Sequence, residues 1–315
     1  DTSNDPKWSG MGHEMIAFTH YYIVENGESF YLHAGESVSI EDIEVPHIQH
    51  NFHETSDDKS DWDNLMYAIS DGISRGEMTK VVASREVQFT SDTPYNVASI
   101  LANLVENNPN CFIFGYEKDG RTFVGASPEI LVRHRGSEIL SYALAGTAPK
   151  DGPNAWTKEQ LLTNTKNIVE HNIVRDRIVN TMKQITPDVT VGETGIMELS
   201  HLYHLRTIIT AKDSTKSLVE WAKLLHPTPA LGGEPREKAL ALLQEYESHE
   251  RGMYAAPFGF MKDMGDGIVV VAIRSALIMD NVLYAYAGCG VVADSDADEE
   301  YAETNNKMRT ILDAL

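Results

Sequence analysis

Residues 268–287 read IVVVAIRSALIMDNVLYAYA, and this stretch decides the fold class. β-Branched and apolar residues fill its two halves, and Asp280-Asn281 separates them with a pair typical of a tight turn. We therefore expect a strand over 268–278 and another over 282–287, joined as an antiparallel hairpin. Such a hairpin differs from the strand–helix–strand crossover that builds a parallel sheet.

Strand-like and helix-like runs alternate along the chain from residue 65 onward. Further strands are expected at 81–83 (within KVVASREVQF), 111–116, 122–125 and 130–133. Amphipathic helices are expected at 64–75, 97–107, 158–185, 217–225, 236–246 and 299–315, with Ser217 and Asp298 as N-caps. This pattern predicts an α+β protein with a largely antiparallel sheet core wrapped by helices.

The chain is strongly acidic: its 315 residues include 26 Lys and Arg against 47 Asp and Glu, a formal net charge of −21. Such a surface repels phosphate backbones and anionic lipid, so neither nucleic acid nor a membrane is an expected partner. No apolar run reaches about 18 residues, and no signal peptide is recognisable, which favours a cytoplasmic protein. Cys111 and Cys289 are too few for a disulfide framework and are expected to be reduced thiols.

The sequence matches several familiar motifs only in part. Gly288-Cys289-Gly290 begins a loose dinucleotide-binding pattern, but six carboxylates lie within residues 294–303, a poor environment for a pyrophosphate. The same acidic run lacks the glycine and the final glutamate of a calcium-binding EF-hand loop. His201 and His204 have the spacing of one helical turn, and no third metal ligand lies near them in the sequence.

The predicted C-terminal helix carries the strongest chemical pattern. Glu300, Glu303 and Lys307 share one helical face, although a solvated face with a Glu–Lys pair gives the same spacing. Glu170 is a second isolated carboxylate, in a half-apolar helix. Carboxylates from two helices that meet at a cleft would bind a hard cation such as Mg²⁺ through oxygen.

Two further ionisable residues stand beside predicted strands. Glu129, in GASPEIL, is either a turn residue or a general acid whose pKa partial burial raises. Lys80 is either a strand-flanking cation or a base whose ammonium form is disfavoured by its surroundings. Spacing leaves both alternatives open.

Nine motifs, taken together in their order, resemble a known enzyme family. They are KVVASR (80–85), GASPEIL (125–131), LAGT (144–147), KNIVEH (166–171), HLYHL (201–205), LLHPTPALGG (224–233), AIR (272–274), YAGCGVVADSD (286–296) and EYAETNNK (300–307). The series is similar to that of the chorismate-utilising enzymes, which comprise isochorismate, salicylate, anthranilate and aminodeoxychorismate synthases. HPTPALGG resembles the isochorismate synthase branch, and within that branch the chain as a whole is most similar to the menaquinone-pathway enzymes of Gram-positive bacteria.

The resemblance implies Mg²⁺-dependent conversion of chorismate to isochorismate, in which water attacks ring position 2 while the 4-hydroxyl leaves. Lys80 matches the family's base and Glu129 its acid. Glu170 and Glu303 match the Mg²⁺ ligands, and Glu300 an additional one. The implied substrate-binding residues are Thr147, His204, Ala230, Leu231, Tyr254, Arg274, Gly288, Gly290 and Lys307.

The resemblance also implies the organisation of the protein and its partners. Residues 1–63 are expected as an N-terminal remnant that adds strands to the sheet, and residues 64–315 as the chorismate-binding catalytic domain of a single-domain architecture. Chorismate is the expected partner, with no amidotransferase subunit and a monomeric state. A salicylate synthase, a siderophore-pathway isochorismate synthase and a non-catalytic chorismate-binding module remain alternatives.

Overall fold

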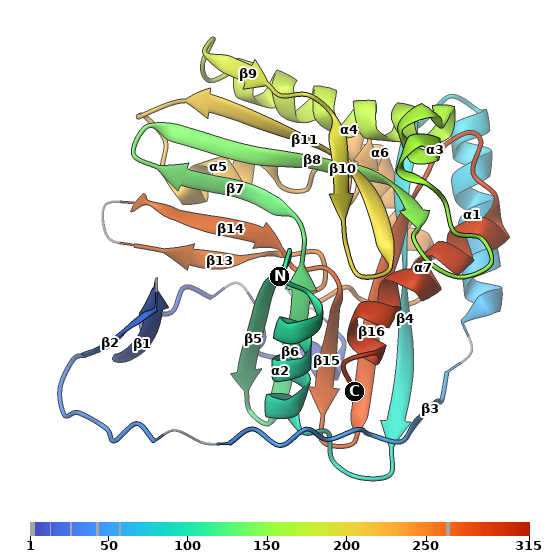
Figure 1. Cartoon of the computed structure of the whole chain (residues 1–315). Helices are drawn as coiled ribbons and strands as arrows, with labels where there is room; N and C mark the ends of the chain where they lie inside the picture. The colour runs from blue at the N-terminus through green and yellow to red at the C-terminus, as the bar shows by residue number, and fades with distance from the viewer. Residues whose placement is uncertain (1–3, 13, 26, 42–43, 57, 263–264) are drawn as a thin grey trace.

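Two seven-stranded antiparallel sheets form the centre of the molecule, and helices lie against both of them (Figure 1). The computed structural model describes residues 4–12, 14–25, 27–41, 44–56, 58–262 and 265–315. The sequence-based prediction of an α+β fold with an antiparallel core wrapped by helices is confirmed.

The strands of each sheet come from distant parts of the sequence. The first sheet has the order β10 (Gly195–Glu198), β11 (Leu202–Lys212), β8 (Glu138–Pro149), β7 (Ile130–Arg135), β14 (Gly267–Val271), β13 (Pro257–Met261), with β9 (Val189–Val191) also on β11. The second has the order β12 (Gly233–Glu234), β4 (Lys80–Ser91), β16 (Val282–Val291), β15 (Ser275–Met279), β6 (Arg121–Ser127), β5 (Phe112–Lys118), with β3 (Phe52–Glu54) on β4.

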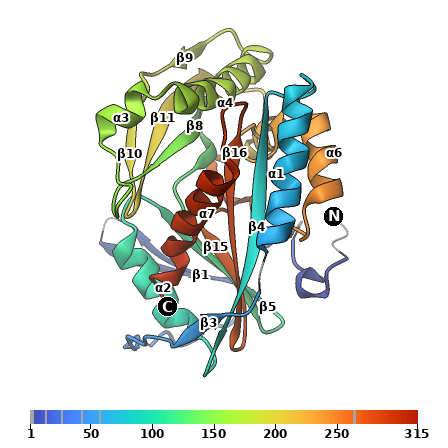
Figure 2. The same ribbon diagram turned by 90° about the vertical axis from the view of Figure 1, so that its right-hand side faces the viewer.

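The helices cover the outer faces of the sheets. They are α1 (Lys59–Ser74), α2 (Val97–Asn107), α3 (Lys158–Thr163), α4 (Thr165–Lys183), α5 (Leu218–Leu225), α6 (Arg236–Tyr246) and α7 (Ala297–Leu312), with a short 3₁₀ helix at Pro6–Trp8. Helix α4 packs on β8 and β11, and α7 packs on β16 of the other sheet. Figure 2 shows α7 crossing the face of the second sheet, with α1 beside it along β4.

The hairpin at Asp280-Asn281 is confirmed, but the strand predicted over 268–278 is wrong. Met279 pairs with Val282 across the turn. Upstream, β14 ends at Val271 in the first sheet and β15 begins at Ser275 in the second. Strand β15 is buried at its first four positions and β14 is buried or half-buried throughout, so their apolar run gives no sign of the change of sheet. The chain turns at Arg274, whose φ of 53° lies in the left-handed region.

Three smaller predictions also need correction. The helix predicted over 158–185 is two helices, because Asn164 ends α3 and its side chain caps α4. The cap of α7 is Asp296, which accepts hydrogen bonds from two backbone N–H groups, and not Asp298. His204 lies in strand β11, so it does not share a helix with His201. The N-cap at Ser217 is confirmed as a capping box with Glu220.

Alternate side chains of the central hairpin pack in two different hydrophobic cores. Ile278 packs in a cluster with residues of α2 and α7, whereas its neighbour Leu277 packs with Phe123 and Tyr286 in the largest core cluster. Because successive side chains of a strand point to opposite faces, β15 is apolar at nearly every position. This explains why the stretch that decides the fold shows no apolar–polar alternation.

Two neighbouring crossovers join the sheets. The chain passes from β6 to β7 through Pro128-Glu129, and from β14 to β15 through residues 272–274. The Ala126 N–H donates to the Arg274 carbonyl over 3.0 Å, and the Val271 N–H donates to the Glu129 carbonyl over 3.1 Å. Glu129 and Arg274 are therefore held at one joint between the sheets.

The N-terminal segment meets the main body in more than one way. Strand β3 pairs with β4, whereas β1 (His20–Glu25) and β2 (Glu28–His33) form a separate two-stranded sheet.

Cys111 and Cys289 are both free thiols, as predicted. Among the residues that the structure describes, no helix is both long enough and apolar enough to cross a membrane.

Ser127 stabilises the joint between the sheets, and its removal is our first prediction. Its hydroxyl is fully buried, donates to the Val271 carbonyl over 2.6 Å and accepts the Glu129 N–H over 3.2 Å. Ser127→Ala leaves that N–H buried without an acceptor, so we expect a loss of about 1–3 kcal/mol in unfolding free energy. Urea unfolding measures it, with Ser74→Ala as the control, since exposed Ser74 donates only to Asp71 in its own helix. Equal stability of the two variants would contradict the stabilising role assigned to Ser127.

Candidate active site

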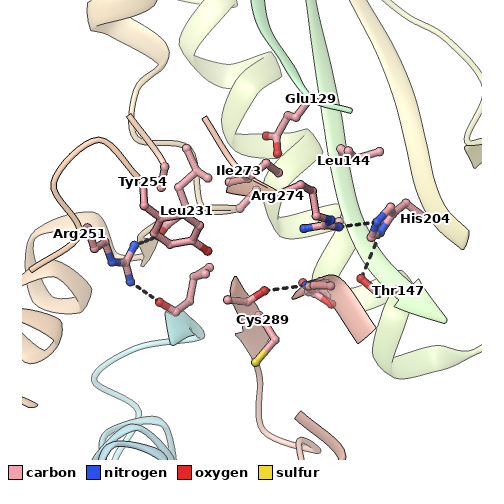
Figure 3. Close-up of a pocket in the computed structure, with 18 residues that line it drawn as sticks. Glu129, Leu144, Thr147, His204, Leu231, Arg251, Tyr254, Ile273, Arg274 and Cys289 are labelled. Atoms are coloured by element: carbon pink, nitrogen blue, oxygen red, sulfur yellow. Dashed lines mark hydrogen bonds between the residues drawn. The ribbon is translucent and has the colours of Figure 1, made fainter. Parts of the chain in front are cut away.

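A cleft opens at the joint between the sheets, beside α4 and α7 (Figure 3). Most of the residues that the sequence singled out line it. They are Glu129, Thr147, Glu170, His204, Ala230, Leu231, Tyr254, Arg274, Gly288, Gly290 and Lys307. The fold thus gathers residues from β8, β11, β16, α4, α7 and the loops between strands into one place.

The other three residues, Lys80, Glu300 and Glu303, lie behind the wall of the cleft. Ion pairs connect two of them directly to residues that line it. The Lys80 ammonium contacts Glu170 Oε1 over 2.9 Å, and Glu303 Oε1 contacts the Lys307 ammonium over 2.6 Å. Glu300 pairs instead with Lys166 over 2.5 Å, one helical turn before Glu170.

Glu129 is placed as a buried acid. Only 3% of the residue is exposed, and Oε1 has no hydrogen-bond partner among the described residues. Burial raises the pKa of Glu129 to about 7, against the opposing influence of the Lys80, Arg274 and Lys307 charges. A carboxyl group with this pKa holds a proton near neutral pH and can donate it to a leaving oxygen.

Arg274 is a buried cation held by a neutral histidine. Its Nη2 donates to His204 Nε2 over 2.8 Å, and the other ring nitrogen of His204 lies 3.1 Å from Thr147 Oγ1 (Figure 3). Burial and the charges of Arg274 and Lys307 keep the pKa of His204 well below its usual value. Within the described residues no carboxylate forms an ion pair with Arg274, and its Nε is buried without a partner. Its guanidinium is thus available to an anionic ligand.

A β-bulge and two glycines shape the cleft. The pairing of β11 with β8 shifts register between His204 and Leu205, which is a common way to redirect a side chain at a site. A Cβ at Gly290 would lie 2.1 Å from Glu170 Oε1, and one at Gly288 would lie 2.8 Å from the Tyr254 hydroxyl. Only glycine fits at these two positions of β16 while the surrounding side chains keep their places.

The carboxylates proposed for Mg²⁺ form a suitable donor set. Glu170 comes from α4, and Glu300 and Glu303 come from α7; all are hard oxygen donors. The described residues show no ready-made cluster of three metal-ligating groups. Burial, and then the charge of Glu303, raise the pKa of Glu300, so these two carboxylates repel one another and a shared cation would relieve the repulsion.

Lysine ammonium groups balance these carboxylates in the structure. Burial alone would raise the pKa of Glu303, but the charge and hydrogen bond of Lys307 hold it below its usual range. Burial would likewise lower the pKa of Lys166, but the combined charges of Glu300, Glu303 and Glu170 raise it. The residues present therefore fit a hard cation. In the structure, lysine ammonium groups balance the carboxylate charges at this place.

The sequence interpretation missed Arg251, which lines the cleft from the loop after α6. Its Nη1 donates to the Leu231 carbonyl over 2.7 Å and its Nη2 to the Val82 carbonyl over 2.8 Å (Figure 3). Arg251 thus ties the loop of Ala230 and Leu231 to strand β4. A signal was present, because Arg251 is the only Lys or Arg between residues 239 and 261 and lies three residues before Tyr254.

Comparisons with known proteins show the family to which the chain belongs. A family model described as chorismate binding enzyme matches residues 27–315. Isochorismate synthase MenF of Bacillus subtilis is 36% identical over 264 residues, 82% of this chain and 56% of that protein. The salicylate biosynthesis isochorismate synthase of Pseudomonas aeruginosa is 32% identical over 266 residues, 83% of this chain and 56% of that protein.

A solved structure is also similar to this chain. The menaquinone-specific isochorismate synthase MenF from Escherichia coli superposes with a TM-score of 0.76 at 30% identity, covering 87% of this chain and 66% of that one. The chain belongs to the chorismate-binding enzyme family. It spans a little over half the length of the two curated relatives named above.

The close approach at Gly290 gives a second prediction. Gly290→Ala forces Glu170 and Lys80 apart, so we expect a loss of about 1–3 kcal/mol in stability, typical of overpacking. Thermal unfolding measures it. Gly195→Ala is the control, since a Cβ at this glycine of β10 meets nothing within 4 Å. If Gly290→Ala unfolds at the temperature of the wild type, the packing described here is wrong.

Proposed function

We propose that the protein is an isochorismate synthase, which converts chorismate to isochorismate. The observation that carries the proposal is the Arg274 guanidinium, buried without a carboxylate partner in the described structure and facing the same cleft as Glu129, whose pKa burial raises to about 7. A buried unpaired cation is costly, so a site of this kind favours an anionic ligand. Chorismate, a dicarboxylate with a leaving hydroxyl, matches both groups, and family membership supports it.

Arg274 binds and orients the substrate in this proposal. It takes the enolpyruvyl carboxylate in two parallel hydrogen bonds, and Tyr254 packs beside the same group. His204, kept neutral, accepts a hydrogen bond from Arg274 and so holds the guanidinium in place. Thr147 fixes the histidine ring, and the wall of Ala230 and Leu231 limits which nucleophile reaches the substrate.

Lys80 and Glu129 move the protons. Lys80 is the proposed general base, which takes a proton from the water that attacks ring position 2. Glu129 gives its proton to the 4-hydroxyl, which leaves as water while the ring double bonds shift. The two groups come from different elements, β4 and the β6–β7 crossover, as acid and base on opposite sides of a ring require.

The metal in this proposal is Mg²⁺, held by Glu170 and Glu303 with Glu300 as an additional ligand. When bound, Mg²⁺ supplies positive charge that holds the ring carboxylate of the substrate against the acidic protein. Lys307, paired with Glu303 and donating to the Gly288 carbonyl over 2.7 Å, holds the adjacent wall. Gly288 and Gly290 leave room for the substrate beside the main chain.

The proposal extends to the setting of the enzyme. We infer a role in menaquinone biosynthesis, supported by the likeness to the MenF enzymes. Residues 64–315 would form the catalytic domain, with residues 1–63 as an N-terminal segment that adds strand β3 to the second sheet. The protein would act as a cytoplasmic monomer without an amidotransferase subunit.

The direct test is product analysis. Incubation with chorismate and Mg²⁺, followed by chromatography, is expected to yield isochorismate as the main product. Salicylate as the main product would replace the proposal with a salicylate synthase. Unchanged chorismate at every Mg²⁺ concentration would favour a binding module without catalysis.

Glu129→Gln tests the acid through turnover and through pH. We expect turnover to fall about 10²-fold or more, because the variant cannot donate the proton. In the wild type, kcat/KM should decrease as pH rises through about 7, where Glu129 loses its proton. The exposed Glu138 gives the control substitution Glu138→Gln. Turnover of Glu129→Gln at the wild-type rate would rule out the assigned role.

The same variant should alter the pH dependence of stability. The folded-state pKa of Glu129 lies above its unfolded value, so the stabilisation is complete below the unfolded pKa of 4.5 and is lost as pH rises through about 7. We expect Glu129→Gln to match the wild type at low pH and to exceed it by about 3 kcal/mol above pH 8. Urea unfolding across pH checks this, and parallel curves would contradict it.

Glu303→Ala tests the metal site. We expect the Mg²⁺ concentration for half-maximal activity to rise by about tenfold or more, together with the KM for chorismate, because a ligand is lost. The control is Glu299→Ala, an exposed carboxylate on the same helix. An unchanged Mg²⁺ titration would exclude Glu303 as a ligand.

A further inference from the structure

Three lysines hold the three carboxylates proposed for Mg²⁺. Lys80 pairs with Glu170, Lys307 with Glu303, and Lys166 with Glu300. The three pairs lie on α4, α7 and the start of β4, so a single small region holds three positive and three negative side chains. The function proposed above uses Lys80 and Lys307 but assigns nothing to Lys166.

Lys80 and Lys307 are fixed in place. The side chain of Lys80 is only 1% exposed and lies below Gly290, where an added Cβ would approach its Cε to 2.7 Å. The side chain of Lys307 is 8% exposed and is also bound to the Gly288 carbonyl. Both lysines are therefore buried and ion-paired with their carboxylates.

Lys166 differs from Lys80 and Lys307 in its exposure and in its surroundings. Its side chain is 23% exposed, while its partner Glu300 is 2% exposed, so the ammonium enters the acidic region from solvent. Lys166 precedes Glu170 by four residues on α4, and Glu300 precedes Glu303 by three on α7, so the lysine stands between the two helices that carry the ligands. The charges of all three carboxylates act on its ammonium.

We propose that Lys166 is the displaceable counter-cation of the metal-free site: its ammonium neutralises the carboxylates of α4 and α7, and Mg²⁺ binds by replacing it. A long flexible side chain with an exposed stem can withdraw into solvent at little cost. This arrangement keeps the buried carboxylates of the two helices from repelling one another before the metal arrives. It rests on the proposed function, because it takes Glu170, Glu300 and Glu303 to be the ligands.

Competition between two cations for the same carboxylates has a measurable consequence. Removal of the Lys166 charge leaves Mg²⁺ without a competitor, so metal binding should strengthen. The metal-free protein should at the same time lose stability, because the carboxylates are left unbalanced. An ordinary structural ion pair would change stability alone, by the same amount with and without metal.

The experiment is a calorimetric Mg²⁺ titration of the wild type and Lys166→Met, without chorismate. We expect the Mg²⁺ dissociation constant to be roughly tenfold lower in the variant, within the usual range of coupling between sites. Thermal unfolding should show Lys166→Met melting below the wild type without metal and at a similar temperature with saturating Mg²⁺. Lys166→Gln, which keeps a polar end, provides the same comparison if the methionine variant does not fold.

Two controls separate charge from position. Lys166→Arg keeps the cation and should bind Mg²⁺ no more tightly than the wild type. Lys158→Met removes a lysine of the neighbouring helix α3 that pairs with Glu198, and should leave the dissociation constant unchanged.

The outcomes distinguish a failure of this inference from a failure of the proposed function. Equal or weaker Mg²⁺ binding by Lys166→Met, with normal binding by the wild type, overturns the role of Lys166 and leaves the proposed function standing. No Mg²⁺ binding by the wild type overturns the metal site of the proposed function, and this inference with it.

Discussion

The two crossovers between the sheets are the constraint on which the rest of the molecule depends. One carries Glu129 from β6 to β7 and the other carries Arg274 from β14 to β15, and backbone hydrogen bonds hold them side by side. Most strand positions on both sides are packed in apolar cores, and buried charged side chains within the strands, such as Arg85 of β4, have an ion-pair partner. At a crossover the chain leaves one ladder before it joins the next, and a polar side chain can enter the cleft. The paired crossovers therefore bring the acid and the cation to the same cleft.

Burial then sets the chemistry of these groups. The same desolvation that raises the pKa of Glu129 to about 7 holds His204 neutral, so one dry environment gives a proton donor and a hydrogen-bond acceptor. Around them, carboxylates and lysines are paired one to one, which limits the cost of burying charge. Arg274 stands outside this pairing. The net charge of −21 thus says little about the ligand, because a locally positive cleft lies within an acidic protein.

Much of the fold followed from the sequence, and the errors have a common cause. Helices α2 and α6 have the predicted ends, because the signals for them act over a few residues: Asn96 caps α2, and Pro235 directly precedes α6. Strands β8 and β11 were missed, since residues such as Thr147 and His204 interrupt their apolar pattern where they face the cleft. The run over 268–278 was read as one strand because a change of sheet leaves no mark in a sequence buried on both faces. Most candidate site residues were found through ordered motifs and not through spacing, which left Lys80 and Glu129 undecided.

The sequence by itself determined the class of fold, the hairpin at Asp280-Asn281 and most of the ionisable residues that line or surround the cleft, Arg251 excepted. These depend on local propensity, turn chemistry and ordered motifs, all of which act over short stretches of chain. Only the tertiary structure decided which groups meet: Lys80 with Glu170, Lys166 with Glu300, and Arg274 with His204. It also decided that Arg251 ties Leu231 to β4. Such pairings join residues up to 169 positions apart, and their pKa values follow from a burial that exists only once both sheets have closed over the cleft.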